Sequence, residues 1–260
     1  MSDTPLAVIT GASAGIGAAI AHEATRDGYA VLLVARRQDR LEQLAQSLPG
    51  EAHIAIADLA DPTGPAAVTE KLFEMGRAAD VLVNNAGVGQ SGPFVHGAAD
   101  RDLAMIDLNV RALVDLTHRL LPAMVERGRG GVLNVASLAA FQPGPNAAVY
   151  YASKAFVLSF SEALHTEVRQ KGVTVSALCP GPVETDFFAL AGMDTVLLRK
   201  VSKSLTPERV AAEGWRGFRK GRRIVLPGMG PKMRAATAGL TPRWVELPVV
   251  KALQSRQKTR

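Results

Sequence analysis

The sequence predicts an α/β protein with a doubly wound, parallel, seven-stranded sheet in a single domain. Short apolar runs alternate with longer segments of helical pattern through six strands, and no linker interrupts them before about residue 186. Most of these runs are apolar throughout, as expected for parallel strands that helices cover on both faces. A chain of 260 residues is long enough to bury such a core without a disulfide or a structural metal.

The elements can be placed in order along the chain. The first six strands are predicted at Leu6–Thr10, Tyr29–Ala35, Ala52–Ala57, Asp80–Asn84, Gly131–Ala136 and Val173–Cys179. The helices between them are predicted near residues 15–27, 38–47, 63–77, 98–127 and 150–171. A further helix is expected near Thr206–Arg219, since Thr206 suits an N-cap and Pro207 the first helical turn. The seventh strand would then be Arg223–Leu226.

Residues 187–205 break this alternation. The stretch from Phe187 to Met193 is apolar, but no clean period follows it. Because it comes after the sixth strand, it belongs at the carboxyl end of the sheet, where open α/β folds bind ligands. We therefore expect a substrate lid here, with a packed surface helix as the alternative.

Composition excludes several classes of protein. The single cysteine, Cys179, excludes an intrachain disulfide and a cysteine-based metal cluster, and the five histidines form no pair four residues apart. We expect no metal site. No apolar run approaches the roughly 18 residues of a membrane span, and the N-terminus lacks a signal pattern, so we expect a cytoplasmic protein.

The net charge of +6 is unevenly distributed. Residues 199–260 hold 16 Lys and Arg against 3 Asp and Glu, whereas residues 1–198 hold 14 against 21. We expect residues 231–260 to form a basic C-terminal extension, a solvated arm that packs on a neighbouring subunit. Contact with an anionic membrane, an acidic carrier or a phosphorylated substrate is the alternative. No nucleic-acid-binding motif accompanies the charge, so we expect no nucleic-acid partner.

The turn after the first strand reads Thr10-Gly11-Ala12-Ser13-Ala14-Gly15-Ile16-Gly17 and leads directly into a helix. Glycines at such a turn let a diphosphate approach the backbone N–H groups at the helix start. The spacing is G-x-x-x-G-x-G, which differs from the common G-x-G-x-x-G fingerprint. The turn predicts a dinucleotide site.

Two arginines follow the second strand. NAD-specific sites usually carry an acidic residue here, whereas an arginine accommodates the 2′-phosphate of NADP. Ala35 takes the place of the acid, and Arg36 and Arg37 follow it. A guanidinium group suits phosphate through its permanent charge and its fork of donors. The sequence therefore favours NADP(H) over NAD.

Tyr150 and Lys154 lie four residues apart and share one face of the predicted helix. A nearby ammonium group favours the phenolate, so we expect Lys154 to lower the pKa of Tyr150 toward the range of a useful acid or base. Ser137 follows the fifth strand, whose carboxyl end meets the same crevice. Its hydroxyl can then bond a substrate carbonyl or alkoxide oxygen.

In these motifs the sequence resembles the short-chain dehydrogenase/reductase family, which implies a Rossmann-like fold over about residues 5–190. The resemblance rests on Thr10–Gly17, Asn84-Asn85-Ala86-Gly87, Asn109, Ser137, Tyr150-x-x-x-Lys154 and Pro180–Thr185, in the order of the family. Residues 1–230 would then form the dinucleotide-binding and catalytic domain.

The resemblance also implies the roles of single residues. It makes Tyr150 the acid/base, Lys154 its partner and a ligand of the nicotinamide ribose, Ser137 the group that polarises the substrate oxygen, and Asn109 the anchor of a proton-relay water. Gly11, Ser13, Ile16 and Gly17 would face the diphosphate and the adenosine ribose. Asp58 and Leu59 would contact adenine, with Asn85 and Gly87 supporting the adenosine side. Pro180, Gly181, Val183 and Thr185 would form the nicotinamide wall.

The expected activity is hydride transfer from NADPH to a ketone or aldehyde, or the reverse from a secondary alcohol. A hydrophobic substrate is expected because the large side chains near the site are Phe94, Leu138, Phe141, Phe187 and Phe188. An NAD-dependent alcohol dehydrogenase and a non-catalytic, cofactor-binding regulator are the alternatives. The 150–171 segment is apolar on more than one face, so one face can pack on a second subunit. The family resemblance then implies a homodimer or homotetramer.

Overall fold

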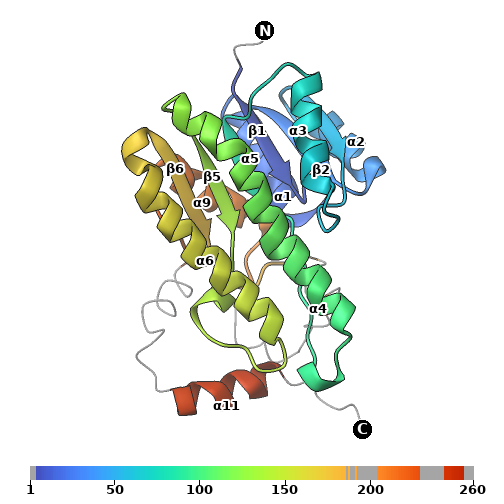
Figure 1. Cartoon of the computed structure of the whole chain (residues 1–260), viewed down its shortest axis with the longest axis vertical. Helices are drawn as coiled ribbons and strands as arrows, with labels where there is room; N and C mark the ends of the chain where they lie inside the picture. Colours follow the sequence, from blue (N-terminus) through green and yellow to red (C-terminus); the bar gives the residue numbers. More distant parts are fainter. Residues whose placement is uncertain (1–3, 186, 188–190, 192–203, 229–242, 255–260) are drawn as a thin grey trace.

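The structure is a computed structural model of the chain and describes residues 4–185, 187, 191, 204–228 and 243–254. Within these residues, seven parallel strands form one sheet in the order β3-β2-β1-β4-β5-β6-β7 (Figure 1). The strands are β1 Leu6–Thr10, β2 Ala30–Ala35, β3 Ala52–Ile56, β4 Val81–Asn84, β5 Gly130–Val135, β6 Val173–Leu178 and β7 Ile224–Val225. The predicted fold class is confirmed.

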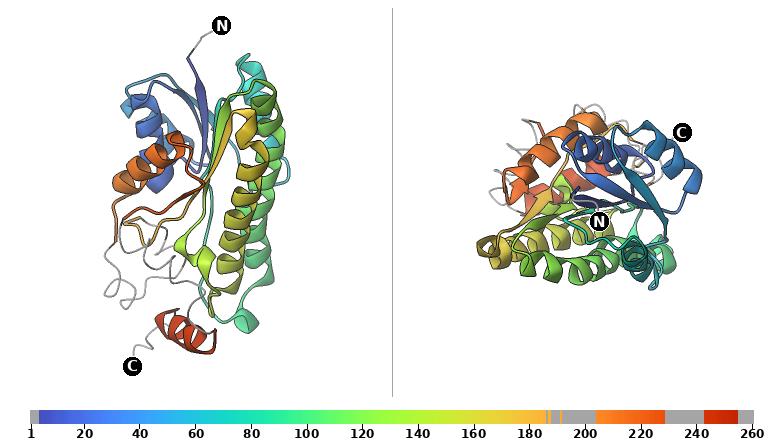
Figure 2. Two further views of the ribbon diagram at one scale, coloured as in Figure 1. Left: turned by 90° about the vertical axis from the view of Figure 1, so that its left-hand side faces the viewer. Right: turned by 90° about the horizontal axis from the view of Figure 1, so that it is seen from above.

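Helices cover both faces of this sheet (Figure 2). One face carries α1 (Gly15–Arg26), α2 (Gln38–Ser47) and α9 (Pro207–Arg219). The other carries α3 (Gly64–Glu74), α5 (Ala112–Glu126) and α6 (Ala148–Val168). In β1, Ala7 and Ile9 belong to the first core, whereas Leu6 and Val8 belong to the second. Because both cores need apolar side chains, the strand is apolar at every position.

The predicted helix near 98–127 is interrupted in the structure. It consists of α4 (Ala99–Ile106), a π-helical turn η2 (Asp107–Arg111) and α5. The apolar pattern does not reveal this turn, because one wider turn shifts the period only locally. The cap predicted for α9 is present, since the Thr206 hydroxyl accepts a bond from the backbone N–H of Arg209 at 3.3 Å.

Most of the predicted lid and the predicted boundary at residue 230 lie outside the described residues. The two ends of the lid segment are fixed beside β6, because Leu205 forms a parallel bridge with Val183. The described part of the C-terminal extension is a helix, α11 (Arg243–Gln254), and its Val250 packs in a cluster with Tyr150. Among the described residues, no helix is both long and apolar enough to cross a membrane.

Candidate active site

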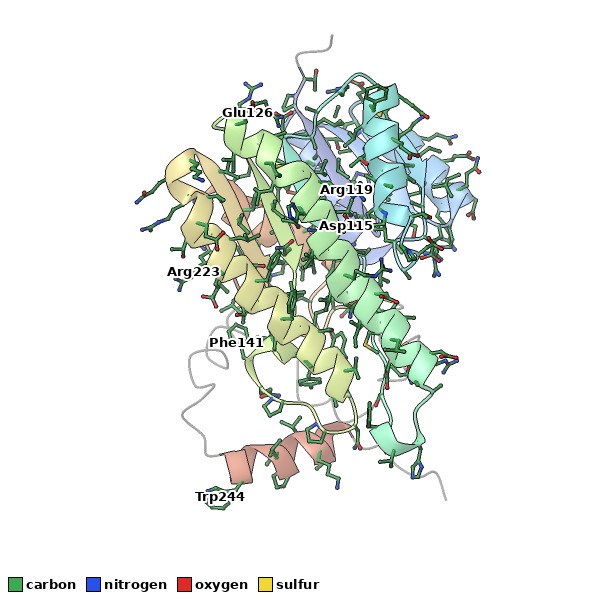
Figure 3. All side chains as sticks on the ribbon, viewed as in Figure 1. Asp115, Arg119, Glu126, Phe141, Arg223 and Trp244 are labelled. Carbon is green, nitrogen blue, oxygen red and sulfur yellow. The ribbon has the colours of Figure 1, made fainter. Side chains whose placement is uncertain are left out.

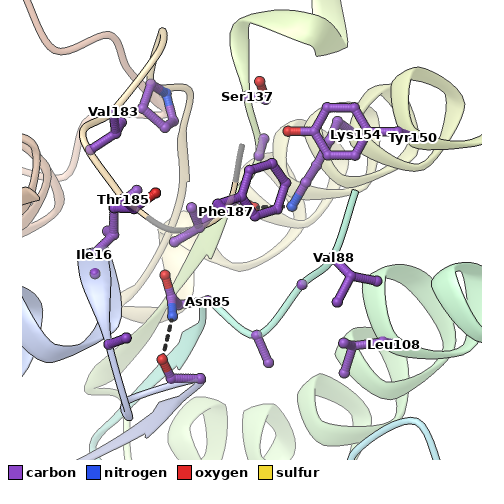
Figure 4. A pocket seen from close by; sticks show the side chains of 18 of the residues that line it. Ile16, Asn85, Val88, Leu108, Ser137, Tyr150, Lys154, Val183, Thr185 and Phe187 are labelled. Atoms are coloured by element: carbon purple, nitrogen blue, oxygen red, sulfur yellow. Dashed lines mark hydrogen bonds between the residues drawn. The ribbon is translucent and has the colours of Figure 1, made fainter. Parts of the chain in front are cut away.

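One cavity of about 590 Å³ lies at the carboxyl ends of the central strands. Most of the site residues predicted from the sequence line it (Figure 4). These are Gly11, Ser13, Ile16, Arg36, Arg37, Asp58, Leu59, Asn85, Gly87, Ser137, Tyr150, Lys154, Pro180, Gly181, Val183 and Thr185. Gly17 and Asn109 are absent from the lining and act from behind it.

The glycine-rich turn needs its glycines for two separate reasons. Gly11 adopts a φ of 64°, and a Cβ atom there would lie 2.8 Å from the Cα of Ala86. At Gly17 a Cβ atom would lie 2.5 Å from the carbonyl oxygen of Gly11. Gly11 thus lets the backbone line the cavity, whereas Gly17 lets α1 pack beneath the turn.

The sequence reasoning missed Thr10, which joins this turn to β4. Its hydroxyl accepts bonds from the backbone N–H groups of Asn85 and Ala86, both at 3.0 Å, and donates to the carbonyl of Val83 at 3.1 Å. The Asn85 amide in turn donates to the carbonyls of Thr10 at 2.9 Å and Gly11 at 3.2 Å. The two polar residues hold two neighbouring strand ends together, and Thr10 could have been found as the first residue of the Thr10–Gly17 motif.

Arg36 and Arg37 lie at one end of the cavity, and both side chains are exposed. Arg37 donates to the Ser13 hydroxyl at 3.0 Å, and Arg36 forms an ion pair of 3.4 Å with Asp58. The longer pair is exposed, so it contributes little to stability and leaves the Arg36 guanidinium available to an anion. This end of the cavity therefore combines two cations with the hydroxyl of Ser13.

Tyr150, Lys154 and Ser137 face the cavity from two elements. Tyr150 and Lys154 lie on α6, whereas Ser137 follows β5, and Figure 4 shows the three side chains grouped together. Lys154 Nζ donates to the carbonyl of Val135 at 2.9 Å, so β5 fixes the position of the amine. A Cβ atom on Gly87 would lie 3.3 Å from this Nζ, so the glycine leaves room for it.

Burial dominates the acidity of this group. It raises the pKa of Tyr150 to about 12, although a hydrogen bond with Ser137 acts in the opposite direction. It also lowers the pKa of Lys154 to about 8. The prediction of a lowered pKa for Tyr150 is therefore wrong for this structure, because loss of water around the phenol outweighs the hydrogen bond with Ser137.

Asn109 lies in the π-helical turn, and its side chain acts as a clamp. Its Oδ1 accepts from the backbone N–H of Val88 at 2.9 Å, and its Nδ2 donates to the carbonyl of Val88 at 2.9 Å and to Ser153 Oγ at 3.1 Å. Ser153 Oγ donates to the carbonyl of Tyr150 at 2.7 Å. The clamp therefore connects the cavity wall at Val88 to the first turns of α6. The expected water-relay role stays a prediction.

The other end of the cavity is largely apolar. The rings of Phe187 and Tyr150 lie 5.7 Å apart, so Phe187 covers the phenol. The remaining apolar side chains at this end are Val88, Leu108, Leu138, Phe141 and Tyr151. Val88, Leu108 and Tyr151 had not been singled out from the sequence, and neither had Gln142, which also lines the cavity.

Two residues expected near the substrate need comment. Phe94 was expected beside the cavity, but it is absent from the lining and lies in the 3-10 turn η1 (Phe94–His96) with its side chain mostly exposed. This turn stands beyond Gly92, away from the strand ends. Phe188 lies outside the described residues.

Comparison with known proteins agrees with this geometry. Residues 5–194 match the family described as short chain dehydrogenase. The chain is 39% identical over 194 residues to sulfoacetaldehyde reductase 2 of Chromohalobacter salexigens, covering 72% of this chain and 75% of that protein.

Two solved structures resemble the whole chain. A short-chain dehydrogenase from Sphingobium yanoikuyae in complex with NADPH shares 30% identity over 98% of both chains, with a TM-score of 0.79. A bulky-bulky ketone specific alcohol dehydrogenase from Comamonas testosteroni shares 26% identity over 100% of this chain and 97% of that one, with a TM-score of 0.75. The chain thus belongs to the short-chain dehydrogenase/reductase family and is an oxidoreductase of alcohol or carbonyl substrates.

Proposed function

We propose that this protein is an NADPH-dependent reductase of ketones or aldehydes that carry large apolar substituents. The observation that carries the proposal is one cavity lined by Tyr150, Ser137 and Lys154, by Arg36 and Arg37 after β2, and by many apolar side chains. The similarity to a structure that holds NADPH supports the choice of cofactor.

The residues around the first part of the cavity fit a phosphorylated dinucleotide. Gly11 leaves no room for a side chain, so the backbone of the turn can meet a diphosphate. Arg36 and Arg37 offer guanidinium groups at the position where a 2′-phosphate is bound in this fold. When bound, the cofactor supplies the hydride, and the chain supplies everything that handles the substrate oxygen.

The protein side of the reaction follows from the acidity of Tyr150. With a pKa of about 12, its phenol is protonated at neutral pH, so Tyr150 can donate a proton to the oxygen of a carbonyl being reduced. Ser137 is placed to donate a second hydrogen bond to the same oxygen. Lys154, with a pKa of about 8, is mostly cationic at pH 7 and stabilises negative charge that develops beside it.

The character of the substrate follows from the apolar end. Apart from Arg36 and Arg37, the one cation among the described residues of the lining is Lys154. A small anionic substrate, such as the one named for the relative from Chromohalobacter, needs a cation at the substrate end to hold it. The walls formed by Leu138, Phe141 and Phe187 instead favour an uncharged, apolar carbonyl compound.

Oxidation of NADPH against a panel of carbonyl compounds tests this proposal. The panel pairs aromatic and long-chain ketones with small anionic aldehydes of equal reactivity, and Tyr150→Phe is the control. We expect turnover of the apolar compounds and a loss of about 10²- to 10⁴-fold in kcat for Tyr150→Phe. Preference for the anionic aldehydes would contradict the substrate class, and an unchanged rate in Tyr150→Phe would contradict the mechanism.

A further inference from the structure

Helix α11 lies across one end of the molecule. In Figures 1 and 2 it occupies the end opposite the N-terminus, and its axis runs across the direction of α5 and α6. Its inner side belongs to the protein core, because Val250 is 4% exposed and packs in a cluster with Met105, Tyr150 and Tyr151. This contact fixes which side of the helix faces outward.

The outward side of α11 is apolar too. Trp244 is 77% exposed and Val249 is 54% exposed, and Pro248 and Ala252 are exposed between and beyond them. Figure 3 shows the Trp244 ring projecting away from the body of the protein. A helix that is apolar on two opposite sides is expected to be covered on both, and the described residues of the chain cover only one of them.

A second exposed apolar element lies at the same end. The turn η1 stands below α4 in Figure 1, and its Phe94 and Val95 are both largely exposed. We call Phe94, Val95, Trp244, Pro248 and Val249 the end patch. Because two separate elements expose large apolar side chains at the same end of the molecule, we treat this end as a candidate interaction surface.

Charge indicates what covers the end patch. From residue 243 to residue 260 the sequence carries five Lys and Arg against one Glu. An anionic membrane attracts such a segment, whereas two copies of this chain meeting end to end would bring two basic segments together. Helices that bind membranes peripherally also lie flat in the interface, and α11 lies flat across the end of the molecule.

We propose that the end patch docks this protein on anionic phospholipid surfaces, with Trp244 and Val249 entering the boundary between headgroups and acyl chains. The inner side of α11 touches the cluster that holds Tyr150, so a docked molecule presents the substrate end of its cavity near the lipid. The docking surface itself does not depend on which carbonyl compound the enzyme reduces.

Co-sedimentation with vesicles tests the docking. The full chain is mixed with vesicles of phosphatidylcholine and phosphatidylglycerol at 3:1, or of phosphatidylcholine alone. We expect binding to the anionic vesicles that weakens as NaCl is raised, and a partition coefficient at least about tenfold lower for the double variant Trp244→Glu/Val249→Glu. Phe73→Glu is the matched control, since Phe73 is 87% exposed but belongs to α3, a helix that Figure 1 shows away from α11 and nearer to the N-terminus.

Tryptophan emission gives a second readout. The chain has two tryptophans, and Trp215 is buried, with its ring N–H donating to Asp27 at 3.0 Å. Anionic vesicles should therefore shift the emission of Trp244 to shorter wavelength, and brominated lipid should quench it. If the emission shift and the quenching both arise from Trp244 in the end patch, neither should be observed in Trp244→Phe.

Three results would overturn the proposal. The first is that the protein sediments equally with both kinds of vesicle, or with neither kind. The second is that Phe73→Glu lowers the partition coefficient as much as the double variant does. The third is a light-scattering mass, measured without lipid, that falls in Trp244→Glu/Val249→Glu, because the end patch would then be buried between copies. Unchanged activity of the double variant without vesicles shows that it is folded.

Discussion

The proposed preference for NADPH depends on two single side chains, Arg36 and Arg37. Neither is buried, and their partners, Asp58 and Ser13, are weak ones. A phosphate group can therefore attract both guanidinium groups, because only weak interactions with Asp58 and Ser13 are given up when the side chains turn toward it.

We expect Arg36→Ala and Arg37→Ala to lower kcat/KM for NADPH by about 10- to 100-fold while the value for NADH changes little, because each loses a charge-assisted bond to the 2′-phosphate. Steady-state kinetics with both cofactors measure this. Arg40→Ala is the matched control, as Arg40 is an exposed arginine one residue beyond Asp39 on α2. Equal losses with NADPH and NADH would indicate an NAD-type site.

The raised pKa of Tyr150 predicts opposite pH profiles for the two directions of reaction. Well below its pKa of about 12 the phenol keeps its proton, so kcat/KM for reduction should be flat from about pH 6 to pH 7. It should fall only around pH 8 and above, where Lys154, with a pKa of about 8, loses its charge. Oxidation needs the phenolate, so its kcat/KM should rise with pH across the same range. Tyr151→Phe should keep both profiles, since its ring lies beside Tyr150 at 6.0 Å without taking its place.

A fall in reduction through pH 7 would instead show that the pKa of Tyr150 is lowered in the working enzyme. That is the direction expected from the Tyr150–Lys154 spacing alone. The spacing places the two groups on one face but carries no information on how far water is excluded, and here burial decides the pKa. Residue identity and position could thus be predicted from the sequence, whereas acidity could not.

At the scale of elements, the π-helical turn η2 is a feature that the sequence does not predict, although its Asn109 supports the cavity wall at Val88. The sequence predicts the helix that contains it, the following helix α6 and the capped start of α9. It does not predict the wider turn: the family resemblance identifies Asn109, but its partner, Val88, is distant in sequence. Contacts of that kind depend on how the elements are packed.

Removing the clamp at this turn should weaken both stability and catalysis. Asn109→Ala leaves the backbone N–H and C=O of Val88 without their partner, and we expect a loss of about 1–3 kcal/mol in the free energy of unfolding. The rate should fall as well, because Val88 lines the cavity. Urea unfolding and kcat measure the two effects, with Asn109→Asp as the conservative variant that keeps the acceptor for the Val88 N–H. Full stability in Asn109→Ala would show that the clamp is energetically unimportant.

In the whole molecule, helices cover both faces of the sheet, so there is one apolar core on each face. Truncating a buried side chain should therefore lower the free energy of unfolding by a similar amount in either core. Leu32 and Leu33 are neighbours on β2, but Leu32 packs in one core and Leu33 in the other. We expect Leu32→Ala and Leu33→Ala each to lower the free energy of unfolding by about 2–5 kcal/mol. Chemical denaturation checks this, with Ile56→Ala on the exposed side of β3 as the control of small effect. A large cost at only one leucine would mean that one face is loosely packed.

The oligomeric state belongs to this scale and stays a prediction, as does the cytoplasmic location. On α6, Phe156 is partly exposed and stacks on Phe160 with ring centroids 5.7 Å apart. If this face joins subunits in a homodimer or homotetramer, Phe156→Glu should lower the mass measured by light scattering. Phe73→Glu, on a different helix, should leave the mass unchanged, and an equal mass for wild type and Phe156→Glu would place the subunit contact elsewhere.

The bridge between Val183 and Leu205 has a consequence for how this enzyme can change. The backbone of Glu184 donates to the carbonyl of Leu205 at 3.0 Å, and Leu205 donates to the carbonyl of Pro182 at 3.1 Å. The chain thus leaves the cavity wall at Val183 and returns to the same point before α9 begins. Because both ends of this segment are held, we expect that its sequence can be exchanged to alter substrate choice while the sheet and Tyr150 keep their positions.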